Sequence, residues 1–258
     1  MNFKLTLGYS TLAERVATLV EPPLSPDWET VLVVQNPNQI DWQGTRFQEL
    51  AKRQNFRSEE LKSKGVAKSR NRAIELAHGE YLIFSDDDIT FSEQGLREAI
   101  EYLDSNPDVS LLLGQATDES GALRKQYPSQ ITKLGSLNSA RAATYEMIVR
   151  VADIKKLGIR FDEEFGAGAK NYLGDEYIFV VDLVRAGGKA VFAPITFAQH
   201  PTESSGSRWG SANDRRARAV IFTRVFGPLA PLVRLPFGIR RRQELGSVKN
   251  LILFVLGR

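Results

Sequence analysis

The stretch Gly79-Glu-Tyr-Leu-Ile-Phe-Ser-Asp-Asp-Asp-Ile-Thr-Phe91 carries an apolar run directly into three consecutive carboxylates. The run, residues 81–84, is typical of a buried strand in a parallel sheet. In open α/β sheets, ligands bind beyond the carboxyl ends of such strands, which is where Asp86, Asp87 and Asp88 stand. These carboxylates repel one another unless a cation joins them, and Mg²⁺ or Mn²⁺ prefers such oxygen ligands. The alternatives are a solvated turn or an aspartate that caps the next helix.

Segments typical of strands alternate with segments typical of helices over most of the chain. We expect strands at residues 3–7, 30–34, 81–84, 109–113, 145–151 and 189–194, and helices at 12–20, 47–51, 67–77, 93–103, 152–158 and 175–187. Residues 55–65 are polar and are expected to form a loop, and residues 114–139 a β-rich insert or a substrate-facing loop. The alternation predicts an α/β fold with a mainly parallel sheet flanked by helices.

Composition excludes several kinds of site. The 258 residues contain no cysteine, so disulfides, thiolate metal sites and a cysteine nucleophile are excluded. The N-terminus is expected to be a first strand and not a signal peptide. Because no window holds the roughly 18 to 20 uninterrupted apolar residues of a membrane span, we expect a soluble or peripheral protein.

Charge is distributed unevenly. Residues 215–258 hold ten arginines and lysines against Glu244, which gives +9, so the net charge of +3 leaves −6 for residues 1–214. The tail also carries large apolar residues, as in 217–226 and 250–256, and a composition of this kind suits amphipathic helices on an anionic membrane. We therefore predict a domain over 1–214 and a basic, membrane-associating region over 215–258. Binding of nucleic acid would also explain the positive charge of this region, but the aliphatic content of the region favours lipid. Alternatively, these helices pack on the core or on a second copy, which would make a homo-oligomer.

Two motifs lie close together around the acidic triplet, Gly65-Val-Ala-Lys-Ser-Arg-Asn-Arg-Ala-Ile74 and Gly79 to Asp88. Together they resemble the core signature of family 2 glycosyltransferases, which have the Rossmann-like GT-A fold. The resemblance continues through Gly174-Asp-Glu176 to His200-Pro201 and covers residues 1–210 in order. It implies an inverting enzyme that moves a sugar from a nucleotide diphosphate sugar, most commonly a UDP-sugar, with a divalent metal such as Mn²⁺ or Mg²⁺.

The resemblance also implies roles for individual residues. Asp86 and Asp88 match the Asp-x-Asp pair, in which Asp88 binds the metal directly and Asp86 contacts ribose or metal-bound water. Asp87 is a spacer that reaches the nucleotide, and His200 completes the metal shell. The nucleotide-sugar site then comprises Tyr9, Ser10, Asn36, Gly65, Arg70, Asp86, Asp87 and Arg208, and the metal site comprises Asp86, Asp88 and His200.

Parts of the family pattern are missing. The loop after the first strand lacks the family's usual run, and Gln35-Asn36 replaces an acid after the second strand, so the resemblance leaves the base open. For Arg70 the alternative is a charged helix face.

The general base implied by the resemblance is Asp175 or Glu176. The order of the two acids is swapped relative to the family, so both are kept. We expect the dipole of the helix that begins there to lower the carboxylate pKa and keep the base ionised. First-turn acids are common on any helix, which is the alternative. The preceding loop, residues 165–172, resembles the acceptor side of the site.

The sequence therefore predicts a glycosyltransferase that acts on a glycan or lipid-linked saccharide in cell-surface polysaccharide synthesis. It would work in the cytoplasm, peripherally on the inner face of the cell membrane, without nucleic acid. The rivals are a nucleotidyltransferase acting on a sugar phosphate and a non-catalytic membrane-binding module with the same fold.

Overall fold

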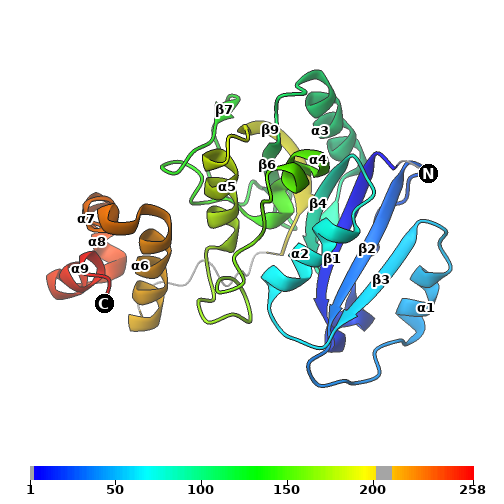
Figure 1. The fold of residues 1–258 in the computed structure, drawn as a ribbon, viewed down its shortest axis with the longest axis horizontal. Helices are drawn as coiled ribbons and strands as arrows, with labels where there is room; N and C mark the ends of the chain where they lie inside the picture. Colours follow the sequence, from blue (N-terminus) through cyan, green and yellow to red (C-terminus); the bar gives the residue numbers. More distant parts are fainter. Residues whose placement is uncertain (1–2, 202–210) are drawn as a thin grey trace.

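A mixed, mainly parallel sheet forms the centre of the molecule in the computed structural model, which describes residues 3–201 and 211–258. The strand order is β3-β2-β1-β4-β8-β6-β9-β5, with β7 paired to β9. The strands are β1 (Leu5–Leu12), β2 (Trp28–Gln35), β3 (Phe56–Leu61), β4 (Tyr81–Asp86), β5 (Thr90–Phe91), β6 (Leu111–Thr117), β7 (Thr132–Lys133), β8 (Met147–Arg150) and β9 (Ala190–Gln199). The predicted α/β class is confirmed (Figure 1).

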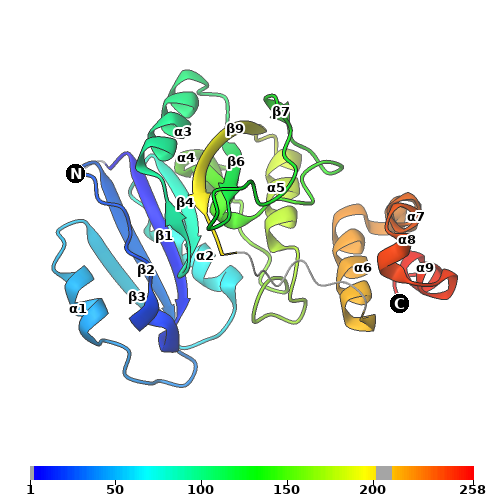
Figure 2. The ribbon, with the colours of Figure 1, turned by 180° about the vertical axis from the view of Figure 1, so that it is seen from behind.

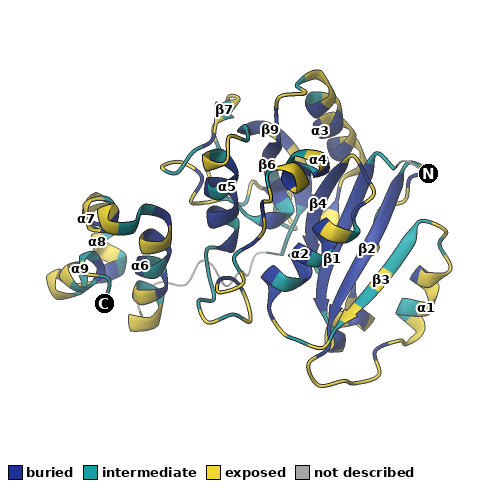
Figure 3. Cartoon of the chain, in the orientation of Figure 1, coloured by how far each residue is buried: buried dark blue, intermediate teal, exposed yellow. Residues whose placement is uncertain are grey.

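Helices cover both faces of this sheet. They are α1 (Thr45–Ala51), α2 (Val66–Leu76), α3 (Glu93–Ser105), α4 (Val151–Lys156) and α5 (Asp175–Arg185), with 3₁₀ helices η1 (Ala13–Thr18) and η2 (Thr144–Glu146). In β4, Tyr81 and Ile83 enter a core with α1, α3 and η1, whereas Leu82 and Phe84 enter the opposite core with α2, α4 and α5. Because both faces are buried, β4 reads as a continuous apolar run (Figures 2 and 3).

The predicted loop at residues 55–65 is wrong, because it contains β3. This strand pairs with β2 in parallel, from Thr30 opposite Phe56 to Gln35 opposite Leu61. It lies at the edge of the sheet and consists of half-buried and exposed residues, so it needs no apolar run. The expected helix at 12–20 is also shorter than predicted: β1 runs on to Leu12 and η1 follows.

The C-terminal region begins with a helix that packs on the body. Its helices are α6 (Ala212–Phe226), η4 (Gly227–Leu229), α7 (Ala230–Arg240), α8 (Arg242–Leu245) and α9 (Val248–Val255). Ile221 and Val225 of α6 join Ile178 and Val181 of α5 in one apolar cluster. The expected division at residue 214 falls in the first turn of α6, and the division into two domains stays a prediction.

The helices after α6 form a small cluster of their own. Phe222 of α6 contacts Phe237 of α7 and Phe254 of α9, with ring centroids 4.9 and 5.9 Å apart. These helices lie beyond α6, on the side away from the sheet (Figures 1 and 2). By length and composition alone, Ala212–Arg240 is the one segment in the described ranges that is long and apolar enough to cross a membrane. The segment is interrupted at Gly227, where φ is +54° and α6 ends.

Candidate active site

The acidic triplet emerges at the carboxyl edge of the sheet. Strands β1 and β4 are parallel neighbours, and their register places Ser10 beside Asp86. The carboxyl ends of both strands therefore open at one edge, as expected for ligand binding in an α/β sheet. Ser10 is 4% exposed, and its hydroxyl has no hydrogen-bond partner among the described residues. This places one predicted nucleotide-site residue directly against another.

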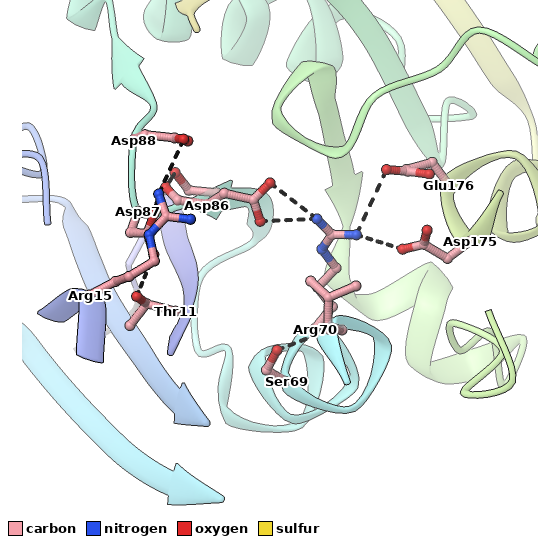
Figure 4. A network of polar contacts seen from close by, with 11 residues as sticks. Thr11, Arg15, Ser69, Arg70, Asp86, Asp87, Asp88, Asp175 and Glu176 are labelled. Atoms are coloured by element: carbon pink, nitrogen blue, oxygen red, sulfur yellow. Dashed lines mark hydrogen bonds and ion pairs between the residues drawn. The ribbon is translucent and has the colours of Figure 1, made fainter. Parts of the chain in front are cut away.

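One buried guanidinium joins this edge to the start of α5. Arg70 on α2 is 4% exposed and lies between Asp86 on one side and Asp175 with Glu176 on the other (Figure 4). Its Nη2 is 3.0 Å from Asp86 Oδ1, its Nη1 is 2.5 Å from Asp175 Oδ2, and Nη1 is 3.8 Å from Glu176 Oε1. Burial disfavours the charge, but the three carboxylates outweigh burial and raise the pKa of Arg70. The interpretation of Arg70 as a solvated charge on a helix face is therefore wrong.

The two candidate bases differ in access. Asp175 is 3% exposed and is bound by Arg70, whereas the Glu176 side chain keeps 24% of its surface exposed. Gly166 lies against the Asp175 carboxyl group: a Cβ at Gly166, whose φ is +93°, would come within 2.8 Å of it. Asp175 is thus enclosed between Arg70 and a glycine turn, and Glu176 is the carboxylate that a substrate can reach.

The expected low pKa of the base is wrong for Glu176. Burial and the negative charge of Asp175 together raise the pKa of the Glu176 carboxyl to about 8, and the charge of Arg70 opposes both. The helix dipole acts in the other direction, but its effect is small next to desolvation and a neighbouring like charge. A carboxyl with a pKa near neutrality is suited to accept a proton from a hydroxyl group.

Asp87 does not act as a spacer that faces a nucleotide. It is buried, and Thr11 Oγ1 donates a 2.5 Å hydrogen bond to its Oδ2, while Arg15 Nη2 lies 2.5 Å from its Oδ1 (Figure 4). Burial raises the pKa of Asp87, and the bond from Thr11 and the charge of Arg15 oppose the shift. Asp87 therefore anchors the acidic segment to the end of β1 and to η1. Neither Thr11 nor Arg15 carried any signal in the sequence pattern.

The donor groups fit a divalent cation only in part. No set of three or more histidine, cysteine or acidic residues arranged to hold a metal occurs in the described part of the chain. Yet Asp88 Oδ1 is a buried carboxylate oxygen that lacks a hydrogen-bond partner among the described residues, an arrangement that favours a bound cation. Its Oδ2 has a 3.4 Å contact with Arg15. The donor set itself, carboxylate oxygens with an imidazole, suits Mn²⁺ or Mg²⁺.

His200 reaches the same edge from β9. Gln199, the last residue of β9, pairs with Thr90 of β5, two residues after Asp88. The His200 Nδ1 atom lies 2.6 Å from the Pro201 carbonyl oxygen, and the Tyr145 ring packs against the imidazole at 4.9 Å. A proton on Nδ1 that is donated to a carbonyl leaves the Nε2 lone pair for a ligand. In this tautomer His200 keeps Nε2 for a ligand, but the described residues do not bring His200, Asp86 and Asp88 together as one metal-binding group, and the metal role of His200 stays a prediction. Its neighbour Tyr145 carried no signal in the sequence.

Three other predicted nucleotide-site residues have structural roles here. Tyr9 is 0% exposed and packs edge-on against Phe91 in the core, so it lines no accessible pocket. Asn36 is also buried; it closes a turn by donating to the Ile40 carbonyl at 2.9 Å. The Gly65 amide donates to Gln35 Oε1 at 2.7 Å, which fixes the entry to α2. Arg208 lies outside the described residues.

Known proteins resemble the chain in sequence and in fold. A family model described as Glycosyl transferase family 2 matches residues 9–161, more than half of the chain. An uncharacterized glycosyltransferase of Methanocaldococcus jannaschii is 26% identical over 147 residues, which are 54% of this chain. The chain spans about half, 50%, of that relative's length.

Solved structures of S. aureus TarS share the fold. One crystal structure has a TM-score of 0.63 at 17% identity and covers 96% of this chain and 45% of TarS. TarS 1-349 in complex with UDP-GlcNAc has a TM-score of 0.62 at 16% identity and covers 98% of this chain and 82% of that one. TarS 1-349 in complex with UDP has a TM-score of 0.59 at 16% identity.

Replacing Arg70 by methionine is expected to lower the free energy of unfolding by about 3–5 kcal/mol, because Asp86 and Asp175 lose a buried counter-charge. Urea unfolding measures the change. Arg72→Met is the matched control: this arginine lies on the same helix and pairs with Glu59 at the surface, so its loss should cost about 1 kcal/mol or less.

The partnership with Asp175 can be tested by adding Asp175→Asn to Arg70→Met. The double variant should lose less stability than the sum of the single variants, because the two changes remove the same ion pair. Strictly additive losses would show that the pair does not couple α2 to α5.

Proposed function

Because the chain belongs to glycosyl transferase family 2, we propose that its site moves a sugar from a nucleotide diphosphate sugar to a hydroxyl group of an acceptor. The observation that carries the proposal is the arrangement around Arg70. It holds Asp86, at the edge where a nucleotide would bind, in one network with a reachable base, Glu176. Group transfer needs a donor and an acceptor side by side, and this network joins the two halves of such a site.

Glu176 takes the proton of the acceptor hydroxyl in this proposal. The attacking oxygen then displaces the nucleoside diphosphate from the opposite face of the sugar carbon, with inversion. Asp175 does not reach the acceptor; it holds Arg70 and, through Arg70, Asp86. The partial burial that raises the pKa of Glu176 also limits its contact with water, while 24% of its side chain stays exposed toward an acceptor.

The residues that would hold a divalent metal, Mn²⁺ or Mg²⁺, are Asp86, Asp88 and His200. When bound, such an ion supplies Lewis-acid stabilisation of the negative charge on the departing diphosphate. The Asp88 oxygen without a partner among the described residues and the His200 Nε2 atom left for a ligand support this choice of residues. Ser10 completes the nucleotide side in the proposal, beside Asp86 at the sheet edge.

We take the donor to be a UDP-sugar. This rests on the shared fold of TarS, whose solved complexes contain UDP-GlcNAc and UDP. The acceptor is a glycan or a lipid-linked saccharide in cell-surface polysaccharide synthesis, handled at the inner face of the cell membrane. The loop of residues 165–172, which leads to the base, would receive it.

A membrane site is supported by the surface of the C-terminal helices. Leu232, Val248 and Leu256 are 70%, 73% and 60% exposed, and arginines and a lysine lie among them in the sequence. Exposed aliphatic side chains with basic neighbours suit an anionic lipid interface, because the aliphatic side chains can insert among the lipids while the basic ones contact the headgroups. Nucleic acid would bind the basic side chains but would leave the aliphatic ones exposed.

Product analysis tests the function against its nearest rival. With a UDP-sugar and acceptor, the expected small product is UDP, whereas a nucleotidyltransferase acting on a sugar phosphate releases pyrophosphate. Release of pyrophosphate would reject the proposed reaction. Failure to turn over any nucleotide sugar, with or without Mn²⁺, would instead favour a non-catalytic module.

The role of Glu176 predicts a pH dependence. Because the base works only when ionised and its pKa is about 8, kcat/KM should rise roughly tenfold per pH unit below 8 and level off above it. Glu176→Gln should lower kcat by about 10²–10⁴-fold and remove this limb. The control Glu164→Gln changes an exposed acid just before the loop of residues 165–172 and should leave the profile unchanged. A retained acidic limb in Glu176→Gln would assign the base elsewhere.

Membrane association is tested with liposomes that contain phosphatidylglycerol. Replacing Leu232, Val248 and Leu256 together by glutamine should abolish co-sedimentation, because it removes the exposed aliphatic surface. The matched control is Leu137→Gln, an 80% exposed leucine in the insert, which should bind as the parent does. Equal binding by all three proteins would rule out the α7–α9 surface as the lipid contact.

A further inference from the structure

A second arginine, Arg15, contacts the acidic triplet from the solvent side. It lies on η1, directly after β1, and its Nη2 is 2.5 Å from Asp87 Oδ1 and 3.4 Å from Asp88 Oδ2 (Figure 4). Its side chain is 51% exposed, whereas that of Arg70 is 4% exposed. Arg15 can therefore leave the carboxylates by rotating its own side chain, and Arg70 cannot.

The two aspartates that Arg15 contacts are held differently. Asp87 is buried and keeps a second partner, Thr11, whose hydroxyl donates to its other carboxylate oxygen. Asp88 has only the long contact with Arg15 on one oxygen, and its other oxygen lacks a partner among the described residues. The 3.4 Å contact between Arg15 and Asp88 is thus longer than the contacts that hold Asp87. Asp88 is also the residue proposed as the direct metal ligand.

A guanidinium and a divalent cation that bind the same carboxylate repel each other, because both are positively charged. With Arg15 in place, a metal ion at Asp88 would meet a positive charge beside it, so binding of the metal alone is disfavoured. A nucleoside diphosphate offers the guanidinium a better partner, because phosphate oxygens accept two parallel hydrogen bonds from arginine. The exposed side chain of Arg15 can turn toward such a group at the same sheet edge.

We propose that Arg15 makes metal binding depend on the nucleotide: it neutralises Asp87 and Asp88 in the empty site and moves to the diphosphate when the donor binds, which releases Asp88 to the metal. The inference rests on the proposed function, since it assumes a nucleotide diphosphate donor and a metal at Asp88. Its consequence is reciprocal: UDP strengthens Mn²⁺ binding, and Mn²⁺ strengthens UDP binding by the same factor.

The test measures binding and not turnover. The electron paramagnetic resonance signal of free Mn²⁺ is titrated with protein, with and without UDP. For the unaltered protein, UDP should tighten Mn²⁺ binding about tenfold or more. Arg15→Gln should bind Mn²⁺ alone about fivefold tighter than the unaltered protein, and the effect of UDP should shrink. Arg15→Lys keeps the charge and should not tighten binding of Mn²⁺ alone.

The controls separate this inference from the proposed metal site. Arg97→Gln removes a similarly exposed arginine that pairs with Glu93 on α3, and it should change neither value. Asp88→Ala should abolish Mn²⁺ binding in the presence of UDP. If Asp88→Ala does so but Arg15→Gln binds Mn²⁺ as the unaltered protein does, the role of Arg15 is overturned and the metal site stands. If the unaltered protein binds no Mn²⁺ even with UDP, both are overturned. Thermal unfolding of each variant confirms that it is folded.

Discussion

The ion pairs of Arg70 are the interaction on which the arrangement of the site depends. The guanidinium and the Asp175 carboxyl are 105 residues apart in the sequence, and both are almost fully buried. A buried charge is costly unless it is paired, and Arg70 has carboxylate partners on two sides. Because these partners come from β4 and α5, the orientation of one carboxylate fixes the orientation of the others.

Packing around α5 keeps this network in place. One face of the helix contributes Phe179 to the core under the sheet, and another contributes Ile178 and Val181 to the cluster shared with α6. Arg224 of α6 adds ion pairs to Asp162 and Asp182. The C-terminal region is thus joined to α5, the helix that carries the proposed base, Glu176.

Arg70 and Arg15 both neutralise carboxylates of the site, and they differ in how exposed they are to solvent. Arg70 is enclosed and compensates charges that never leave the protein, whereas Arg15 is half-exposed and compensates charges that a ligand can take over. The same amino acid therefore serves as a fixed part of the framework in one place and as an exchangeable cation in the other. Lysine would serve less well in either role, because it lacks the planar fork that matches two oxygens.

The sequence by itself determined the fold class, and it predicted where the site would lie. A strand buried on both faces must be apolar throughout, so residues 81–84 indicated a parallel sheet. The three aspartates at the carboxyl end of this strand predicted a site at that edge. The sequence did not predict β3, because this strand lies at the edge of the sheet and is only partly buried. Its residues can therefore be polar, and a polar segment is typical of a loop.

Only the tertiary structure decided which acidic residue is available and which is held. Burial and charge at a point depend on segments far apart in the chain, and no local pattern records them. Asp87 became an anchor because Thr11 and Arg15 meet it. Glu176 acquired a raised pKa because burial and Asp175 outweigh the helix dipole that its sequence position suggested. Tyr9 entered the core, since its position in β1 faces Phe91 and not the open edge of the sheet.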